Sequence, residues 1–161
     1  MAAAALKSKT RKANAANDGF EYYLNPSAAV AAFVLNSKGQ LLTLRRSKAP
    51  AKGTLDLPGG FADIGETIDE ALMREVKEET GLTVTEFEFF TTLPNRYEYS
   101  GFVVPTLDSF FICKVSNETE LQANDDAEEA LWLDLEEVHT EEFGLRSIRH
   151  ALSTFLQKYR R

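Results

Sequence analysis

Cysteine is nearly absent from this chain of 161 residues, and its single copy, Cys113, excludes an intramolecular disulfide and a cysteine-rich zinc site. Long apolar runs are also missing: no segment approaches the roughly 18 apolar residues of a membrane span, and nothing after Met1 resembles the apolar core of a secretory signal. Basic residues number 18 against 25 acidic ones, giving a net charge of −7. A general nucleic-acid or membrane binder is disfavoured, because either surface would repel the chain. These shortages predict a cytoplasmic protein.

The residues that are present suffice for one domain, since 43% of them are hydrophobic. Residues 1–19 differ from the rest in being rich in alanine, lysine and arginine and in having almost no acidic side chain. Large apolar side chains are too few there to build a core, which predicts a flexible basic tail before a domain at residues 20–161. The same composition resembles an organelle transit peptide, although arginine is scarce and the amphipathic pattern is poor.

The domain alternates β-prone and helical patterns. Two β-prone runs, at residues 27–36 and 40–47, flank a Ser-Lys-Gly turn. A helical pattern runs from about Thr67 to Thr80 and is ended by Gly81. Further strands are predicted at TVTEFEFFTTL, TLDSFFICKV and EALWLDL, and a closing amphipathic helix at LRSIRHALSTFLQKYR. Mixed strands with two helices predict an α/β or α+β fold in which helices pack on a sheet.

Residues 57–82 concentrate carboxylates, three of them at Glu75, Glu78 and Glu79. At about 100° per residue these three share one stripe of the expected helix, beside an apolar stripe that includes Met73. Like charges one turn apart cost a few tenths of a kcal/mol per pair, and a divalent cation would remove that cost. Hard oxygen ligands suit Mg²⁺ or Mn²⁺ better than Zn²⁺. On these residues alone, a solvated helical face is the alternative.

The spacing around the three glutamates resembles the signature of the Nudix hydrolases. Gly60 is followed after five residues by Glu66, and after seven more by the run REVKEETGL at residues 74–82, without a mismatch. Average residue usage makes such a match very improbable by chance. The resemblance implies the Nudix fold, a mixed β-sheet sandwiched between helices, with the signature in a loop–helix–loop and the flanking strands fitting out to about residue 160.

Carried over by position, the resemblance also implies roles for individual residues. Glu75 and Glu79 look like direct ligands of Mg²⁺ or Mn²⁺, and the Gly59 carbonyl looks like a further ligand. Glu78 would bind the metal directly or through water and is also a catalytic candidate. The positions implied to be structural are Gly60, Glu66, Arg74 and Gly81.

The general base is often supplied outside the signature in this family, from a loop before a strand that carries a Trp near its start. Here that loop is NDDAEEALWLDL. Counting back from Trp132, Asp126 occupies the place where a Glu is expected, and Glu129 lies one turn nearer. Both are candidates for the base, and a polar turn is the alternative for each.

Two groups of residues are candidates for substrate binding. Arg45 and Arg46 belong to a cluster of four cations within residues 45–52 that could contact phosphate, with solvated strand-end charges as the alternative. Tyr97 and Tyr99 alternate with charged residues in a strand-like pattern, so one face could meet a base, with ordinary packing as the alternative. Asp108 lies among apolar neighbours, where a turn or a satisfied salt bridge is favoured over a substrate or metal role.

The resemblance implies Mg²⁺-dependent hydrolysis of the pyrophosphate bond in a nucleoside diphosphate linked to another moiety, of NADH or ADP-ribose type, giving monophosphate products. The stretch LPNRYEYSGF lies where NADH pyrophosphatases carry a Pro- and aromatic-rich motif, but its letters differ. GFEYYLNPSAAV resembles the join to a zinc ribbon in their relatives, but Ala13 and Ala16 occupy the CxxC spacing, so zinc should be absent.

Two other functions stay open at this point, as does the assembly state. One is hydrolysis that removes modified nucleoside triphosphates. The other is a non-catalytic Nudix-fold module that senses a nucleotide, against which the intact glutamate set argues. The expected partner is a small nucleotide, without nucleic acid or membrane, and a homodimer is left open.

Overall fold

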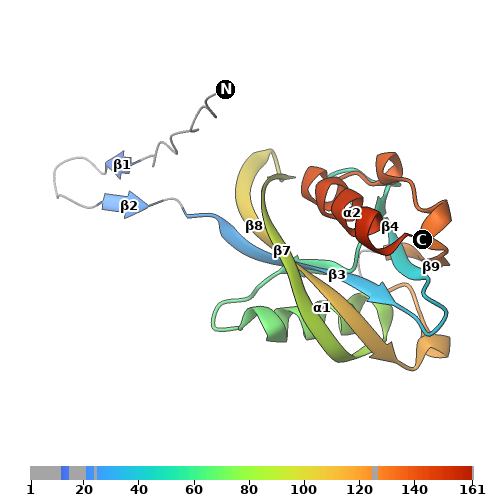
Figure 1. Ribbon diagram of the computed structural model, residues 1–161. Helices are drawn as coiled ribbons and strands as arrows, with labels where there is room; N and C mark the ends of the chain where they lie inside the picture. The colour runs from blue at the N-terminus through green and yellow to red at the C-terminus, as the bar shows by residue number, and fades with distance from the viewer. Residues whose placement is uncertain (1–11, 15–20, 24, 125–126, 161) are drawn as a thin grey trace.

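The computed structural model describes residues 12–14, 21–23, 25–124 and 127–160, and Figure 1 shows one main sheet between two helices. The strands are β1 (Lys12–Asn14), β2 (Glu21–Tyr23), β3 (Ser27–Leu35), β4 (Leu41–Arg46), β5 (Leu55–Asp56), β6 (Gly59–Phe61), β7 (Thr83–Tyr99), β8 (Phe102–Ser116) and β9 (Ala127–Leu133). The helices are α1 (Ile68–Thr80), α2 (Arg146–Tyr159) and the 3₁₀ turns η1 (Glu118–Glu120), η2 (Leu135–Glu137) and η3 (Thr140–Glu142). None of the helices among these residues is long and apolar enough to cross a membrane.

The sheet is mixed, as the sequence predicts. Its strand order is β5-β4-β3-β8-β7, with β6 also pairing with β3 and β9 with β4. Among the strand pairs of the described residues, β3 and β8 run parallel and the other neighbours run antiparallel. β1 and β2 form a separate antiparallel pair. Most of residues 1–19 lies outside the described part of the chain, so the flexible tail stays a prediction.

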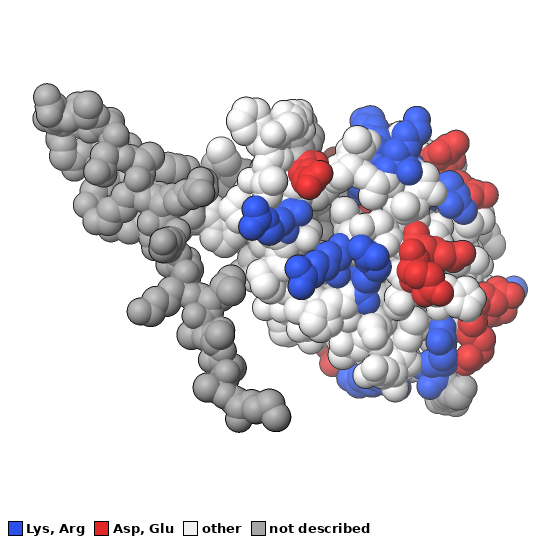
Figure 2. All heavy atoms as spheres, turned by 90° about the horizontal axis from the view of Figure 1, so that it is seen from above, with Lys and Arg blue, Asp and Glu red and all other residues white. Residues whose placement is uncertain are grey.

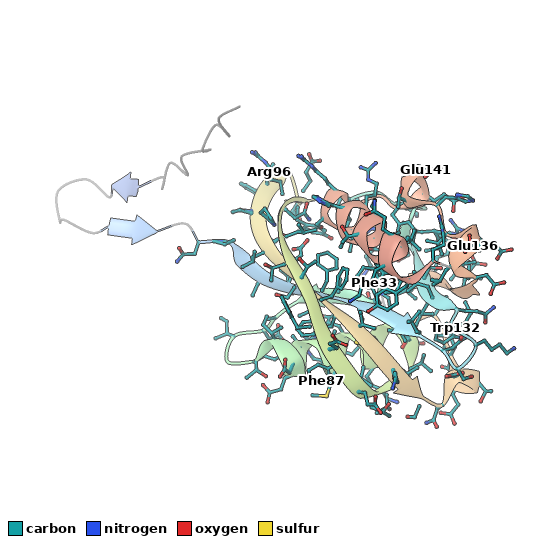
Figure 3. All side chains as sticks on the ribbon, viewed as in Figure 1. Phe33, Phe87, Arg96, Trp132, Glu136 and Glu141 are labelled. Atoms are coloured by element: carbon teal, nitrogen blue, oxygen red, sulfur yellow. The ribbon has the colours of Figure 1, made fainter. Side chains whose placement is uncertain are left out.

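Two hydrophobic cores form because the side chains of β3 alternate between the two faces of the sheet. Ala31 and Phe33 pack on the α2 side, and Phe33 is labelled in Figure 3. Phe33 stacks on Phe155 with 4.3 Å between ring centroids. Val30 and Val34 pack on the α1 side. The prediction of a mixed sheet sandwiched between helices is therefore confirmed.

Local signals fix both ends of α1. Thr67 accepts a hydrogen bond from the Glu70 N–H while the Glu70 side chain accepts one from the Thr67 N–H, forming a capping box. Gly81 ends the helix in the left-handed conformation, with φ of 72°. One expectation for this helix was wrong: Met73 is 41% exposed, because only a narrow stripe containing Leu72 faces the sheet.

The β7–β8 hairpin is longer than the sequence pattern suggests, since β7 continues through the proline-containing stretch to Tyr99. Ser100 and Gly101 form the turn, both with positive φ, at 48° and 80°. This continuation pairs residues 95–97 with β8 and brings Asn95 and Tyr97 to a cavity that Ile148 of α2 also lines. On the face that Figure 2 shows, acidic and basic side chains are interspersed and no continuous basic surface forms.

Replacing Phe155 by alanine tests the packing of α2. Phe155 is fully buried and touches three aromatic rings, so we expect Phe155→Ala to lower the free energy of unfolding by about 3–5 kcal/mol. Urea denaturation measures this loss. The exposed Gln157 on the same helix is the matched control, and Gln157→Ala should change stability by less than about 0.5 kcal/mol. Equal losses in the two variants would contradict the described packing.

Candidate active site

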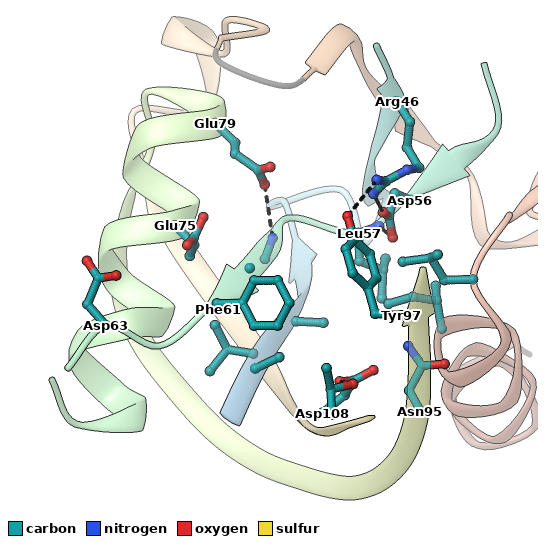
Figure 4. Close-up of a pocket in the computed structure, with 18 residues that line it drawn as sticks. Arg46, Asp56, Leu57, Phe61, Asp63, Glu75, Glu79, Asn95, Tyr97 and Asp108 are labelled. Carbon is teal, nitrogen blue, oxygen red and sulfur yellow. Dashed lines mark hydrogen bonds and ion pairs between the residues drawn. The ribbon is translucent and has the colours of Figure 1, made fainter. Parts of the chain in front are cut away.

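A cavity of about 320 Å³ opens between α1, the sheet and the beginning of α2 (Figure 4). Small residues of β3 leave this space, since Ala29 and Ala31 line the cavity where larger side chains would fill it. Glu75 and Glu79 face it from α1, one helical turn apart. The cavity therefore has an acidic wall on α1, and on the β7–β8 hairpin a wall that contains amide, aromatic, hydroxyl and carboxylate side chains.

Two glycines allow α1 to approach the sheet this closely. A side chain at Gly59 would collide with the backbone of Val30, and a side chain at Gly60 would collide with the carboxylate of Glu75. The Gly59 N–H donates a hydrogen bond of 2.9 Å to Glu79 Oε2. The β6 backbone is thus in direct contact with both cavity-facing glutamates.

Arg74 joins the loop before α1 to the helix itself. Its Nε and Nη2 donate to the two carboxylate oxygens of Glu66, both at 2.8 Å, and Nη2 also donates to the Phe61 carbonyl at 3.0 Å. Its Nη1 donates to Glu75 at 2.8 Å and to Glu78 at 3.1 Å. The hydrogen bonds from Arg74 and from the Asp63 N–H hold the pKa of Glu66 at about 2. The glutamates raise the pKa of Arg74, so the guanidinium stays charged.

The cavity offers oxygen donors of the kind that Mg²⁺ and Mn²⁺ prefer, namely the carboxylates of Glu75 and Glu79 and the Gly59 carbonyl. As the side chains stand, no three Asp, Glu, His or Cys side chains among the described residues form a metal-binding group. In this arrangement Arg74 donates to Glu75 and Glu78, while the Gly59 N–H donates to Glu79. Glu78 is half exposed and does not line the cavity. The metal ligands stay a prediction that the donor types fit.

Across the cavity, Arg46 is held by residues from three segments. Its Nη1 pairs with Asp56 at 2.5 Å, its Nη2 donates to the Tyr97 hydroxyl at 3.2 Å, and its Nε donates to the Pro50 carbonyl at 2.8 Å. Burial on its own would lower the pKa of Arg46, but the Asp56 carboxylate outweighs it and raises that pKa. Arg46 is therefore a fixed positive charge on the cavity wall.

The other residues singled out from the sequence do not gather at this wall. Arg45 points away from Arg46, as neighbours on a strand do, and pairs with Glu129 at 3.1 Å outside the main cavity. Asp126 lies outside the described residues, and so does the side chain of Tyr99. The structure thus brings Arg46 and Tyr97 to the cavity with Glu75 and Glu79, but it does not bring Glu129 there.

Sequence reasoning missed three cavity residues. Phe61 lies edge-to-face with Tyr97 at 5.5 Å between ring centroids. Asn95 lines the cavity from β7, and Asp56 holds Arg46. Alternation along the strand, counted from Tyr97, could have indicated Asn95. Asp108 was expected in a turn or a salt bridge; it lies on strand β8 and is satisfied by hydroxyl groups.

Comparisons with known proteins agree with this geometry. The family model described as NUDIX domain matches residues 25–153, which is most of the chain. The chain belongs to the Nudix family. This Nudix chain is 39% identical over 118 residues to an ADP-ribose pyrophosphatase of Methanocaldococcus jannaschii, covering 72% of the chain and 66% of that protein. It is 32% identical over 123 residues to the human mitochondrial NAD(P)H pyrophosphatase NUDT13, covering 74% of the chain and 32% of that protein.

Solved structures show the same fold. A NUDIX hydrolase from Nitrosomonas europaea superposes with a TM-score of 0.70 at 20% identity, covering 88% of this chain and 76% of that one. The Nudix chain spans less than two thirds of the length of the two curated relatives named above. The match at this identity establishes the fold, and the chemistry has to be argued from the cavity.

The Arg74–Glu66 ion pair makes stability depend on pH in a defined range. The pKa of Glu66 falls from 4.5 to about 2 on folding, so the pair stabilises the fold fully above about pH 4.5 and ceases to do so as the pH falls toward 2. Glu66→Gln should therefore melt below wild type at neutral pH, and the difference should shrink between these two values. Thermal melts across this range measure it, with the exposed Glu141→Gln as control. A difference that is constant with pH would contradict the assignment.

Replacing Gly60 tests whether its contact with Glu75 matters for metal binding. Gly60→Ala should push the Glu75 carboxylate away from β6. We expect Mn²⁺ affinity to fall at least about tenfold, because substitutions that disturb the orientation of a metal ligand typically have an effect of this size. Electron paramagnetic resonance of free Mn²⁺ measures the affinity without substrate. The matched control is Asp69→Asn, an exposed carboxylate in the first turn of the same helix. Unchanged Mn²⁺ binding by the Gly60 variant would argue against Glu75 as a ligand.

Proposed function

We propose that this chain hydrolyses the pyrophosphate bond of a nucleoside diphosphate linked to a second moiety, with Mg²⁺ or Mn²⁺, and that its substrate is of the ADP-ribose or NADH type. One observation carries the proposal: Glu75 and Glu79 face a cavity that also contains the fixed charge of Arg46 and two aromatic rings. The names of the archaeal and human relatives, an ADP-ribose pyrophosphatase and an NAD(P)H pyrophosphatase, support the substrate type.

The two walls of the cavity suit the two parts of such a substrate. Glu75, Glu79 and the Gly59 carbonyl would hold a divalent ion, which would neutralise charge on the pyrophosphate and lower the pKa of a bound water. Arg46 adds a positive charge across the cavity that is oriented by Asp56 and needs no rearrangement to meet an anion. Tyr97 and Phe61 offer ring surfaces to a base.

Three residues are candidates for the general base: Glu78, Asp126 and Glu129. Arg74 donates to Glu78, and Arg45 pairs with Glu129, so neither carboxylate is directed into the cavity as described. A base has to reach the attacking water within hydrogen-bonding distance. Amide variants of all three, compared in one assay, identify which carboxylate fills this role.

A substrate panel with Mg²⁺ tests the proposed reaction. We expect ADP-ribose or NADH to yield two monophosphate products, separated by chromatography, in preference to 8-oxo-dGTP. Glu75→Gln and Glu79→Gln should each lower turnover several hundredfold or more, because each removes a ligand charge without opening a cavity.

The control for the glutamate variants is again Asp69→Asn, which should keep turnover near that of wild type. Melting temperatures of all variants establish that the fold is retained. Near-wild-type turnover in both glutamine variants would contradict the metal site. Hydrolysis of triphosphates alone would contradict the substrate type.

A further inference from the structure

The cavity has a second polar end that none of the proposed metal or phosphate contacts uses. It is formed by the β7–β8 hairpin, on which Asn95 pairs with Thr106 and Asp108 follows two residues later on the same face. All three residues line the cavity, and Figure 4 shows Asn95 and Asp108 away from Glu75 and Glu79, beyond the ring of Phe61. A ligand whose phosphates lie at the α1 wall would extend toward this end.

Asp108 is a buried hydrogen-bond acceptor with unused capacity. It is 8% exposed, and its two oxygens accept from the hydroxyls of Thr106 and Ser147, each at 2.6 Å. An ionised carboxylate can accept about four hydrogen bonds. Among the described residues, no cation forms an ion pair with it, and its two partners are both hydroxyl groups. Each oxygen of Asp108 already has one hydroxyl donor, and its remaining acceptor capacity can take a further donor from a ligand in the cavity.

Asn95 supplies the complementary groups beside it. Among the described residues, none forms a hydrogen bond with the Asn95 side chain, which therefore offers an N–H donor and a carbonyl acceptor to the cavity. The rings of Phe61 and Tyr97 lie next to these polar groups, at an interplanar angle of 87°. Proteins commonly recognise a heteroaromatic ring by hydrogen bonds to its polar edge together with contacts between its face and aromatic side chains.

We propose that this end of the cavity binds the base of the nucleotide and selects a purine with an amino group at position 6, as in adenine, over one with an oxygen there, as in hypoxanthine. Asp108 accepts from the amino group and Asn95 donates to the adjacent ring nitrogen. In hypoxanthine the oxygen at position 6 would face the lone pairs of Asp108, and the adjacent ring nitrogen, which carries a hydrogen, would face the N–H donor of Asn95. The inference rests on the proposed function in taking the ligand to be a nucleotide.

The competing role for Asp108 is structural, because its bond to Ser147 fastens β8 to α2. Such a role would affect stability and would treat all bases alike. Selectivity between two bases is therefore the readout that separates the two roles.

Titration calorimetry of AMP and IMP with the full chain tests the inference, since these ligands share the ribose and phosphate and differ in the base. Wild type should bind AMP about 10- to 100-fold more tightly, the range that a well-placed pair of hydrogen bonds gives. Asp108→Asn, which adds a donor, should reduce this ratio to about one or reverse it. Asn95→Ala should weaken AMP binding without changing the melting temperature.

Ser147→Ala is the matched control, because it removes the fastening of Asp108 to α2 and leaves the carboxylate in place. It should lower the melting temperature and preserve the AMP preference. Equal affinity of wild type for AMP and IMP, binding of neither, or a preserved ratio in Asp108→Asn would overturn the inference. A clear AMP preference without hydrolysis of any substrate would support it while refuting the proposed function, so the two failures are distinguishable.

Discussion

The close contact of β6 with its neighbours is the constraint on which the site depends. β6 lies against β3 on one side and α1 on the other, at a separation that leaves no room for a side chain at Gly59 or Gly60. At this distance the backbone of Gly59 donates directly to Glu79, and Glu75 packs over Gly60. A wider separation would move both glutamates from the sheet and would break the acidic wall of the cavity.

Arg74 provides the second level of organisation, because it neutralises part of the charge that this contact concentrates. One guanidinium serves three glutamates and a backbone carbonyl, so the loop before α1 and the helix are fixed relative to each other. Glutamates on one helical face would otherwise repel one another. Glu79 instead accepts a hydrogen bond from the Gly59 N–H of β6. A cation that binds Glu75 and Glu79 would therefore meet one carboxylate bonded to Arg74 and one bonded to the backbone.

Across the cavity, a positively charged side chain is held in place in a similar way. Asp56 is buried and holds Arg46, and Tyr97 adds a hydroxyl from the hairpin. The cost of burying the two ions is reduced by the hydrogen bond between them and by the bond that the Leu57 N–H donates to Asp56. The result is a cation whose position is set before any anion arrives, and preorganisation of this kind is how protein sites stabilise charge at low reorganisation cost.

Much of the fold could be predicted because its signals are local. The capping box at Thr67 and the left-handed Gly81 determine α1 from neighbours within a few residues, and the β-prone run at residues 27–36 contains strand β3, whose nearly continuous apolar sequence suits burial on both faces. The exposed Met73 escaped prediction, because the width of the buried stripe depends on how the helix lies on the sheet. Arg45 and Arg46 looked equivalent in the sequence, and only the pairing of β4 decided which one faces the cavity.

The sequence by itself determined the family, the acidic helix and the spacing of its glutamates, since these are properties of consecutive residues. The tertiary structure alone decided which side chains meet across the cavity. The register of β7 on β8 brings Asn95 close to Asp108, and the packing of α2 adds Ser147. The hydrogen bond between Ser147 and Asp108 joins residues that are 39 positions apart in the sequence. No short pattern specifies such contacts, because they arise only when separate elements pack on one sheet.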